Sequence, residues 1–292
     1  MTEPFCDFVS ATVPDEEWLG LRPEIQAELD AIGMHVDYDR ERETVWRSPL
    51  ADGTVKSRSI SGVRTISASG AVCAGLRAAG RFASFLAAIA ARPHRVTRLD
   101  ASLDVRQDAP PVIAAAVEKG RAGEVSLTRK SVRPRDVTTF YGVRDDGRVS
   151  GTAYFGTPNS TVRLCMYDKQ HERMSRGLPD VGPLTRYELR LRGDTGITMR
   201  DVHDPRDVFW HFMPECLLKF SGGVSGWEPG RTGFDLERLP ALSPVERMYR
   251  RIDDSPEVIA LVKLAGEVGP NGLDVMFSRI RSRHGFRAEA SA

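Results

Sequence analysis

The feature that most constrains this fold is a set of segments in which apolar and charged residues alternate. Residues 95–105 carry apolar side chains on one side of an extended chain and polar ones on the other, namely Leu99, Ala101, Leu103 and Val105 against Arg98, Asp100, Ser102 and Asp104. Residues 184–192 repeat the pattern, with a polar side made of Arg186, Glu188, Arg190 and Arg192. Successive side chains of a strand point to opposite faces, so these segments favour an antiparallel sheet with one face covered and the other polar.

Other segments complete the expected fold. Strand-like runs occupy residues 137–143, 152–155 and 161–169, and three shorter ones lie between 34 and 67, where Asp52-Gly53 signals a turn. Helical spacing marks residues 15–32, 72–91, 110–118 and 204–220, and three further helices between 243 and 284. We therefore predict an α+β protein: a central, mostly antiparallel β-sheet with helices packed on one face, followed by a helical C-terminal region.

Length and charge suggest how the chain is organised. A chain of 292 residues makes one large domain or two modest ones, and we divide it into an acidic helical segment 1–33, a sheet domain 34–200 and a helical region 201–292. The net charge is +1, but residues 1–46 sum to −9 and residues 47–200 to +12. A basic middle favours one face that meets a polyanion, although ordinary surface charge explains it equally well.

The sequence shows neither a membrane-spanning stretch nor a secretory signal. The longest apolar stretch, residues 82–91, is shorter than the roughly 20 residues that cross a bilayer, and the first residues lack a basic and apolar signal segment. We expect a cytoplasmic protein without a membrane partner.

Carboxylates on the polar strand faces form one candidate site. Asp100 and Asp104 lie on the same face of their strand, and Glu188 lies on the polar face of another. If the two strands are neighbours, Asp100 and Glu188 would converge on a hard cation such as Mg²⁺ or Mn²⁺, with Asp104 as an outer or alternative ligand. The alternative is a solvated strand face without a metal.

A tyrosine forms the other candidate site. In residues 161–169, Arg163, Tyr167 and Lys169 share a face. A free phenol has a pKa of about 10, so two flanking cations would favour its ionised form and its use as an oxygen nucleophile. The same cations would hold a phosphate. A half-buried strand tyrosine with ordinary neighbours is the commoner case, and we treat the other five tyrosines as structural.

Four motifs in this region occur together in order. They are Arg98-Leu-Asp100 with Asp104; Tyr154-Phe-Gly156 with Ser160; Arg163 with Tyr167, Lys169 and Glu172; and Arg186-Tyr187-Glu188 with Arg192. In this order they resemble the Rep_trans family of replication initiation proteins, which rolling-circle plasmids and some phages and integrated elements encode. The resemblance extends loosely over residues 30–220 and makes 34–200 the nicking domain.

The resemblance implies a nicking and strand-transferring reaction. Tyr167 matches the family's active tyrosine, which attacks a DNA phosphodiester, forms a 5′-phosphotyrosine link and frees a 3′-OH primer. A divalent metal held by carboxylates assists, and we carry this role to Asp100 and Glu188. The family's basic turn is replaced here by Thr157-Pro158-Asn159.

The resemblance also implies partners. We expect DNA contacts from arginines of the polar strand faces and from the basic stretch 129–135, namely Arg98, Arg186, Arg190, Arg192, Lys130 and Arg133. Since the sequence has no helicase motor motif, a separate helicase is expected; a homodimer is left open. One alternative is a sequence-specific DNA-binding protein on the same scaffold that does not nick. A weaker one is an RNA-binding module, which would need exposed aromatic rings on a sheet face that reads as charged.

Overall fold

A computed structural model of the chain describes residues 3–48, 53–128, 132–143, 147, 149–193 and 195–218. The chain divides into two compact units, 1–239 and 240–292, and all described residues lie in the first. The strands are β1 (Phe5–Pro14), β2 (His35–Arg40), β3 (Glu43–Arg47), β4 (Thr54–Ile60), β5 (Val63–Ala68), β6 (Arg95–Val105), β7 (Val137–Val143), β8 (Val149–Phe155), β9 (Val162–Asp168) and β10 (Thr185–Arg192). The α-helices are α1 (Trp18–Asp30), α2 (Gly70–Ala78), α3 (Phe82–Ala90), α4 (Ala109–Arg121), α5 (Lys169–Ser175), α6 (Met199–His203), α7 (Arg206–Phe212) and α8 (Glu215–Leu218).

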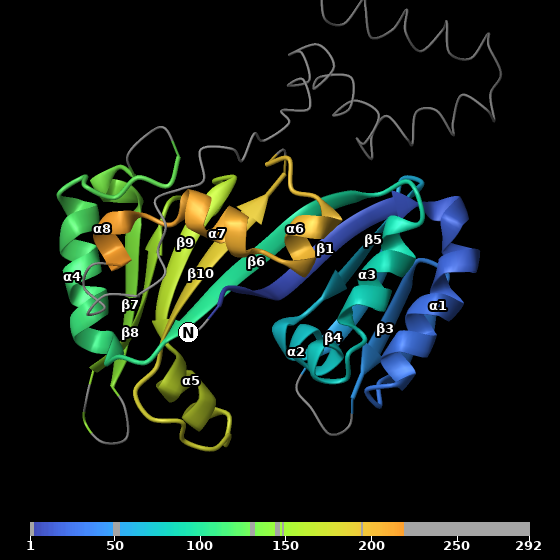
Figure 1. The fold of residues 1–292 in the computed structure, drawn as a ribbon, viewed down its shortest axis with the longest axis horizontal. Helices are drawn as coiled ribbons and strands as arrows, with labels where there is room; N and C mark the ends of the chain where they lie inside the picture. The colour runs from blue at the N-terminus through green and yellow to red at the C-terminus, as the bar shows by residue number, and fades with distance from the viewer. Residues whose placement is uncertain are drawn as a thin grey trace, which may run out of the picture. The chain divides into compact units, whose positions relative to one another are not determined.

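The strands form one sheet in the order β2-β3-β4-β5-β1-β6-β10-β9-β8-β7, and every neighbouring pair is antiparallel (Figure 1). The predicted antiparallel sheet is therefore confirmed. The expected strands at 95–105, 161–169 and 184–192 correspond to β6, β9 and β10.

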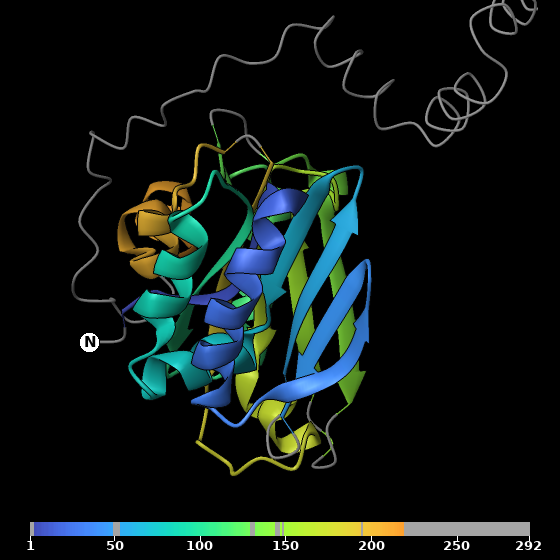
Figure 2. The ribbon, with the colours of Figure 1, turned by 90° about the vertical axis from the view of Figure 1, so that its right-hand side faces the viewer.

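Helices cover one face of the sheet, and Figure 2 shows the other face bare. Helix α4 packs on β7, β8 and β9, α2 packs on β1 and β4, and α6 and α7 pack on β6. The predicted layering is confirmed. It follows from the alternation, since Leu99, Ala101 and Leu103 of β6 are all fully buried in one continuous core. Burying a leucine of this kind contributes about 1.5–3 kcal/mol.

Strand β1 departs from the prediction, which made residues 1–33 helical. It lies in the interior of the sheet, between β5 and β6. Of all its paired residues, Pro14 and Val63 are the closest in sequence. The residues around β1 therefore give little indication of which strands it pairs with. The predicted helix 15–32 does follow it, as a short 3₁₀ turn and α1.

Two predicted helices are broken. Residues 72–91 form α2 and α3, bent by 113°, because Gly80 adopts φ +68° after the last residues of α2. Glycine in this left-handed conformation commonly ends helices. Of the helix expected over residues 204–220, the described part forms α7 and α8, which are separated at Met213, where ψ is 121°; residues 219 and 220 lie outside the described residues. Among the described residues no single helix is long and apolar enough to span a bilayer, and α2 and α3 pass that test only as a bent pair. The helices expected between 243 and 284 lie outside the described residues.

Candidate active site

The strand register arranges the polar residues of the bare face in rows. Strand β10 lies between β6 and β9, so the two charged strands are neighbours. One row contains Asp104, Arg186 and Tyr167, and the next contains Ser102, Glu188 and Cys165. Asp100 lies opposite Arg190.

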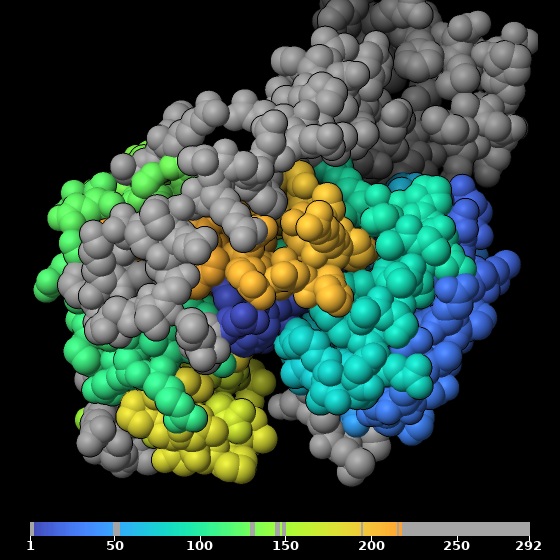
Figure 3. Space-filling view, in the orientation of Figure 1, coloured from blue at the N-terminus to red at the C-terminus, as the bar shows by residue number. Residues whose placement is uncertain are grey.

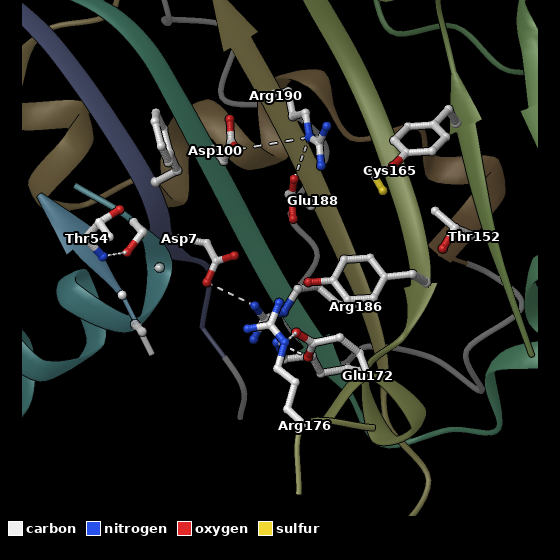
Figure 4. A pocket seen from close by; sticks show the side chains of 18 residues that line it. Asp7, Thr54, Asp100, Thr152, Cys165, Glu172, Arg176, Arg186, Glu188 and Arg190 are labelled. Atoms are coloured by element: carbon white, nitrogen blue, oxygen red, sulfur yellow. Dashed lines mark hydrogen bonds and ion pairs between the residues drawn. The ribbon is translucent and has the colours of Figure 1, made fainter. Parts of the chain in front are cut away.

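A cavity of about 770 Å³ opens over these rows (Figure 4). Its charged lining is balanced, with the carboxylates of Asp7, Asp100, Glu172 and Glu188 and the cations of Lys169, Arg176, Arg186 and Arg190. A second hollow of about 890 Å³, lined by α2 and α5, shares Asp7, Lys169 and Arg186 with it. Figure 3 shows α2 and α5 on the two sides of this hollow. The site therefore reaches the surface between the two helices.

Asp7 is the site residue that the sequence analysis missed. It lies at an irregularity of β1, between Cys6 and Phe8, where the pairing with β6 shifts register. Such a bulge can redirect a side chain. Its carboxylate lies against the start of α2, where a Cβ at Gly70 would be 2.6 Å from both Oδ1 and the carbonyl oxygen of Asp7. The sequence signal that could have indicated this strand is the alternation of apolar and polar residues over 9–13.

Arg186 connects three strands. Its Nε and Nη2 donate to Asp104 at 2.6 and 2.7 Å, and its Nη1 donates to Asp7 at 2.9 Å. Burial opposes the charge of the guanidinium, but the bond to Asp104 and the charge of Asp7 outweigh burial and raise the pKa of Arg186. The side chain is only 7% exposed. This arrangement disfavours the predicted role of Arg186 in binding DNA directly.

Tyr167 faces the cavity, but its environment differs from the expected one. Burial raises the pKa of Tyr167 well above its usual range; Arg186 opposes this increase, and the charges of Glu188, Asp7 and Glu172 add to it. Burial is thus the largest influence on the pKa of Tyr167, and the cation that opposes it is Arg186 of β10 rather than the expected Arg163 or Lys169. This environment favours the neutral phenol over the phenolate.

The two cations expected beside Tyr167 have other partners. Lys169 begins α5, lies 5.8 Å from the centroid of the Tyr167 ring and forms a 2.7 Å ion pair with Glu172. Arg163 lies 4.1 Å from the ring centroid of Tyr154 and donates to the carbonyl of Gly156. Tyr154, which the sequence analysis treats as structural, also lines the cavity.

Asp100 and Glu188 surround one guanidinium. The Nε of Arg190 lies 2.5 Å from Glu188 and 4.0 Å from Asp100, and Arg98 holds Asp100 from the other side. Burial raises the pKa of Asp100, although the hydrogen bond and charge of Arg98 and the charge of Arg190 act to lower it. Burial also raises the pKa of Glu188; Asp100 adds to the effect and Arg190 opposes it. Both carboxylates would be stabilised by further positive charge.

These carboxylates suit a hard divalent cation in their chemistry. Asp7, Asp100 and Glu188 offer only oxygen donors to the cavity, as Mg²⁺ and Mn²⁺ prefer. Their present partners are arginines, and within the described ranges no group of three His, Cys, Asp or Glu residues stands ready to hold a metal ion. Asp104 is bound on both oxygens by Arg186, which agrees with a place outside any ligand set.

The remaining expected DNA contacts are not among the described residues that line the cavity, although Arg98 contacts Asp100 and Phe8, which do line it. Arg98 stacks 4.3 Å from the ring centroid of Phe8, and Arg192 donates to the carbonyl of Pro158 at 3.0 Å. Arg133 pairs with Asp136 in an exposed segment before β7. Lys130 lies outside the described residues.

The site lies largely within a known family region. Residues 94–210 match the Rep_trans family, described as replication initiation factor. The matched segment runs from β6 to α7 and contains Asp100, Tyr167 and Glu188, whereas Asp7 lies outside it. The resemblance inferred from the four motifs is therefore confirmed for residues 94–210, which are similar to replication initiation factors of the Rep_trans family.

Two individual proteins are also similar. The putative DNA relaxase NicK of Bacillus subtilis (strain 168) is 33% identical over 106 residues, which are 34% of this chain and 28% of the relative. The chain thus matches less than a third of that protein's length. The structure of a rolling circle replication initiator protein from Geobacillus stearothermophilus aligns with a TM-score of 0.42 and 17% identity, covering 66% of this chain and 76% of the other.

Proposed function

We propose that this protein nicks DNA during the initiation of rolling-circle replication, with Tyr167 as the nucleophile. The observation that carries the proposal is the position of Tyr167 in a charged cavity within the family-matched segment. The name of the similar Bacillus protein, a putative DNA relaxase, supports the same kind of reaction.

The chemical step is a transfer of one phosphodiester. The Oη of Tyr167 attacks the phosphorus, an O–P bond forms, and the bond from phosphorus to the 3′ oxygen breaks. The 5′ phosphate stays on the tyrosine, and the 3′ oxygen takes a proton from water and leaves as a primer 3′-OH. The phenolic proton passes to one of the cavity carboxylates, whose charges already act on this hydroxyl.

Charged groups assist this step in different ways. Arg186 lies opposite Tyr167 in the strand pairing and favours the phenolate that forms during attack. Lys169 is near enough to stabilise charge on the phosphate. Arg163 is directed toward Tyr154, so we assign it to the DNA strand beyond the scissile phosphate.

Asp100 and Glu188, with Asp7 beside them, would hold Mg²⁺ or Mn²⁺. The metal would supply positive charge to the non-bridging oxygens of the phosphate. Asp104 would act through Arg186. DNA is the partner that this function requires, and a separate helicase would open the duplex after nicking.

A DNA-binding protein that does not nick remains the second candidate. The raised pKa of Tyr167 and the pairing of Asp100 and Glu188 with arginines favour it, since both describe a site at rest.

The test is whether a covalent adduct forms with a single-stranded nick-site oligonucleotide in Mg²⁺ or Mn²⁺. We expect an adduct with the wild type, none with Tyr167→Phe, and an adduct with the control Tyr154→Phe, which removes a hydroxyl from the same cavity. Peptide mapping should place the DNA on Tyr167. An adduct on another tyrosine would refute the assignment, and no adduct from the wild type would favour the second candidate.

A further inference from the structure

An exposed aromatic ring lies on the bare face of the sheet, in the same row as Tyr167. Phe140 of β7 is paired with Thr152 of β8, which is paired with Tyr167 of β9. Neighbouring strands are about 4.8 Å apart, so Phe140 lies about 10 Å from Tyr167 across the sheet. The side chain between them is a threonine, which is too small to separate the two rings.

Phe140 is 61% exposed, although it belongs to a regular strand. Its ring meets Tyr154 edge-to-face, with 5.9 Å between the centroids. Tyr154 lines the cavity and lies beneath the guanidinium groups of Arg163 and Arg190, at 4.1 and 5.5 Å. A line of aromatic rings and guanidiniums therefore leads from the cavity to the edge of the sheet.

Two arginines near these rings bond main-chain carbonyls rather than carboxylates. Arg163 and Arg192 both donate to main-chain carbonyls of the turn 156–160, at 3.1 and 3.0 Å. In the described part of the chain, no ion pair links either of them to a carboxylate. They are available to a phosphate on the side where Phe140 offers a ring.

We propose that Phe140 is a stacking platform for a base of single-stranded DNA close to the scissile phosphate. The inference rests on the proposed function for the position of that phosphate. A single strand needs flat rings for its bases and cations for its backbone, and this edge of the sheet presents both. The exposed ring of Phe140 also corrects the expectation that the polar face of the sheet lacks exposed aromatic rings.

Strand β7 contains its own control. Tyr141 is 59% exposed but points to the other face, where its ring lies over Gly151. Phe140→Ala and Tyr141→Ala therefore remove equally exposed rings from opposite faces of one strand. Phe140→Trp keeps a ring, and Phe140→Leu keeps only apolar bulk.

The experiment measures binding of fluorescein-labelled oligo-dT in EDTA, so that no cleavage intervenes. We expect Phe140→Ala to weaken binding by about 5- to 100-fold, the effect of one stacked base, while Tyr141→Ala binds like the wild type. Phe140→Trp should bind about as tightly as the wild type, whereas Phe140→Leu should bind as weakly as Phe140→Ala. Because no phosphate contact is lost, the salt dependence should keep its slope in every variant.

Quenching of 2-aminopurine near the nick site should disappear in Phe140→Ala. Equal affinity of Phe140→Ala and wild type would overturn the proposal, and so would full rescue by leucine, which would indicate an apolar protein contact. The binding result does not depend on nicking. A wild type that binds through Phe140 but forms no adduct would refute the proposed function and leave only the stacking of a base on Phe140 standing, without its place beside a scissile phosphate.

Discussion

The carboxylate of Asp7 and the guanidinium of Arg186 form a 2.9 Å ion pair although 179 residues separate them in the chain. Arg186 is also the cation that opposes the rise in the pKa of Tyr167. Asp7 lies outside the segment that matches the family, and Tyr167 and Arg186 lie within it. The candidate active site therefore depends on a strand that the family match does not include.

Asp7→Asn should leave the fold intact, because Arg186 keeps its two bonds to Asp104. We expect nicking to slow by roughly 10²-fold, the cost of a misplaced catalytic group, because Arg186 loses one of the partners that fix it. Single-turnover nicking rates measure this effect, with oligo-dT affinity as the internal control. A nicking rate equal to that of the wild type would show that Asp7 has no part in the site.

Gly70→Ala should displace Asp7, because the added methyl group would lie 2.6 Å from its Oδ1. We expect a loss of about 1–3 kcal/mol in the free energy of unfolding, as for other overpacked positions, together with slower nicking. The matched control is Gly75→Ala in the same helix, where the nearest atom would be 3.6 Å away. That variant should be as stable as the wild type or more so, since alanine favours a helix interior. Equal behaviour of the two variants would contradict the close packing of Asp7 on α2.

The raised pKa of Glu188 predicts how stability depends on pH. The folded protein holds this proton more tightly than the unfolded chain, whose glutamate pKa is about 4.3. Relative to Glu188→Gln, which cannot ionise, the wild type should therefore lose stability as the pH rises from about 4 through the raised pKa. The loss amounts to about 1.4 kcal/mol for each pH unit that separates the folded and unfolded pKa values.

Urea unfolding in EDTA at several pH values measures this difference. Glu118→Gln, at an exposed position on α4, is the control and should follow the wild type. A constant difference between the wild type and Glu188→Gln across the range would mean that burial does not perturb this carboxyl.

Mn²⁺ should raise the thermal unfolding temperature of the wild type, since a ligand that binds only the folded state stabilises it. The increase should be lost in Asp100→Asn and Glu188→Gln and kept in Glu118→Gln. EDTA should stop nicking while oligo-dT binding persists. An increase that survives in both Asp100→Asn and Glu188→Gln would place the metal elsewhere.

The alternation of β6 and β10 was enough to predict the sheet and its covered face. The meeting of Asp100 and Glu188 was predicted only if the two strands are neighbours, and the pairing of β6 with β10 meets that condition. These features follow from local pattern, because a strand with one apolar face specifies its own orientation. The break between α2 and α3 also had a local sign in Gly80, but the apolar spacing continued across it and concealed the bend.

The state of Tyr167 could not be predicted from its own strand. Its pKa depends on burial and on Arg186, Glu188 and Asp7, which belong to β10 and β1. Arg163 shares a strand face with Tyr167, yet it turns to the Gly156 carbonyl and the Tyr154 ring. Sequence spacing gave the face of each side chain, whereas contacts across strands determine its partner and its charge.

The interior position of β1 has a consequence for how the protein is made. Strand β1 pairs with β6, whose residues are about 90 positions later, and with β5, about 55 positions later. During synthesis it must wait, unpaired on one or both edges, until those strands emerge, and contacts over such distances form slowly. The family-matched segment, if exchanged alone between proteins, would arrive with β6 lacking a neighbour. A segment of residues 94–210 would therefore keep β6 paired on both edges only in a protein that supplies a strand equivalent to β1.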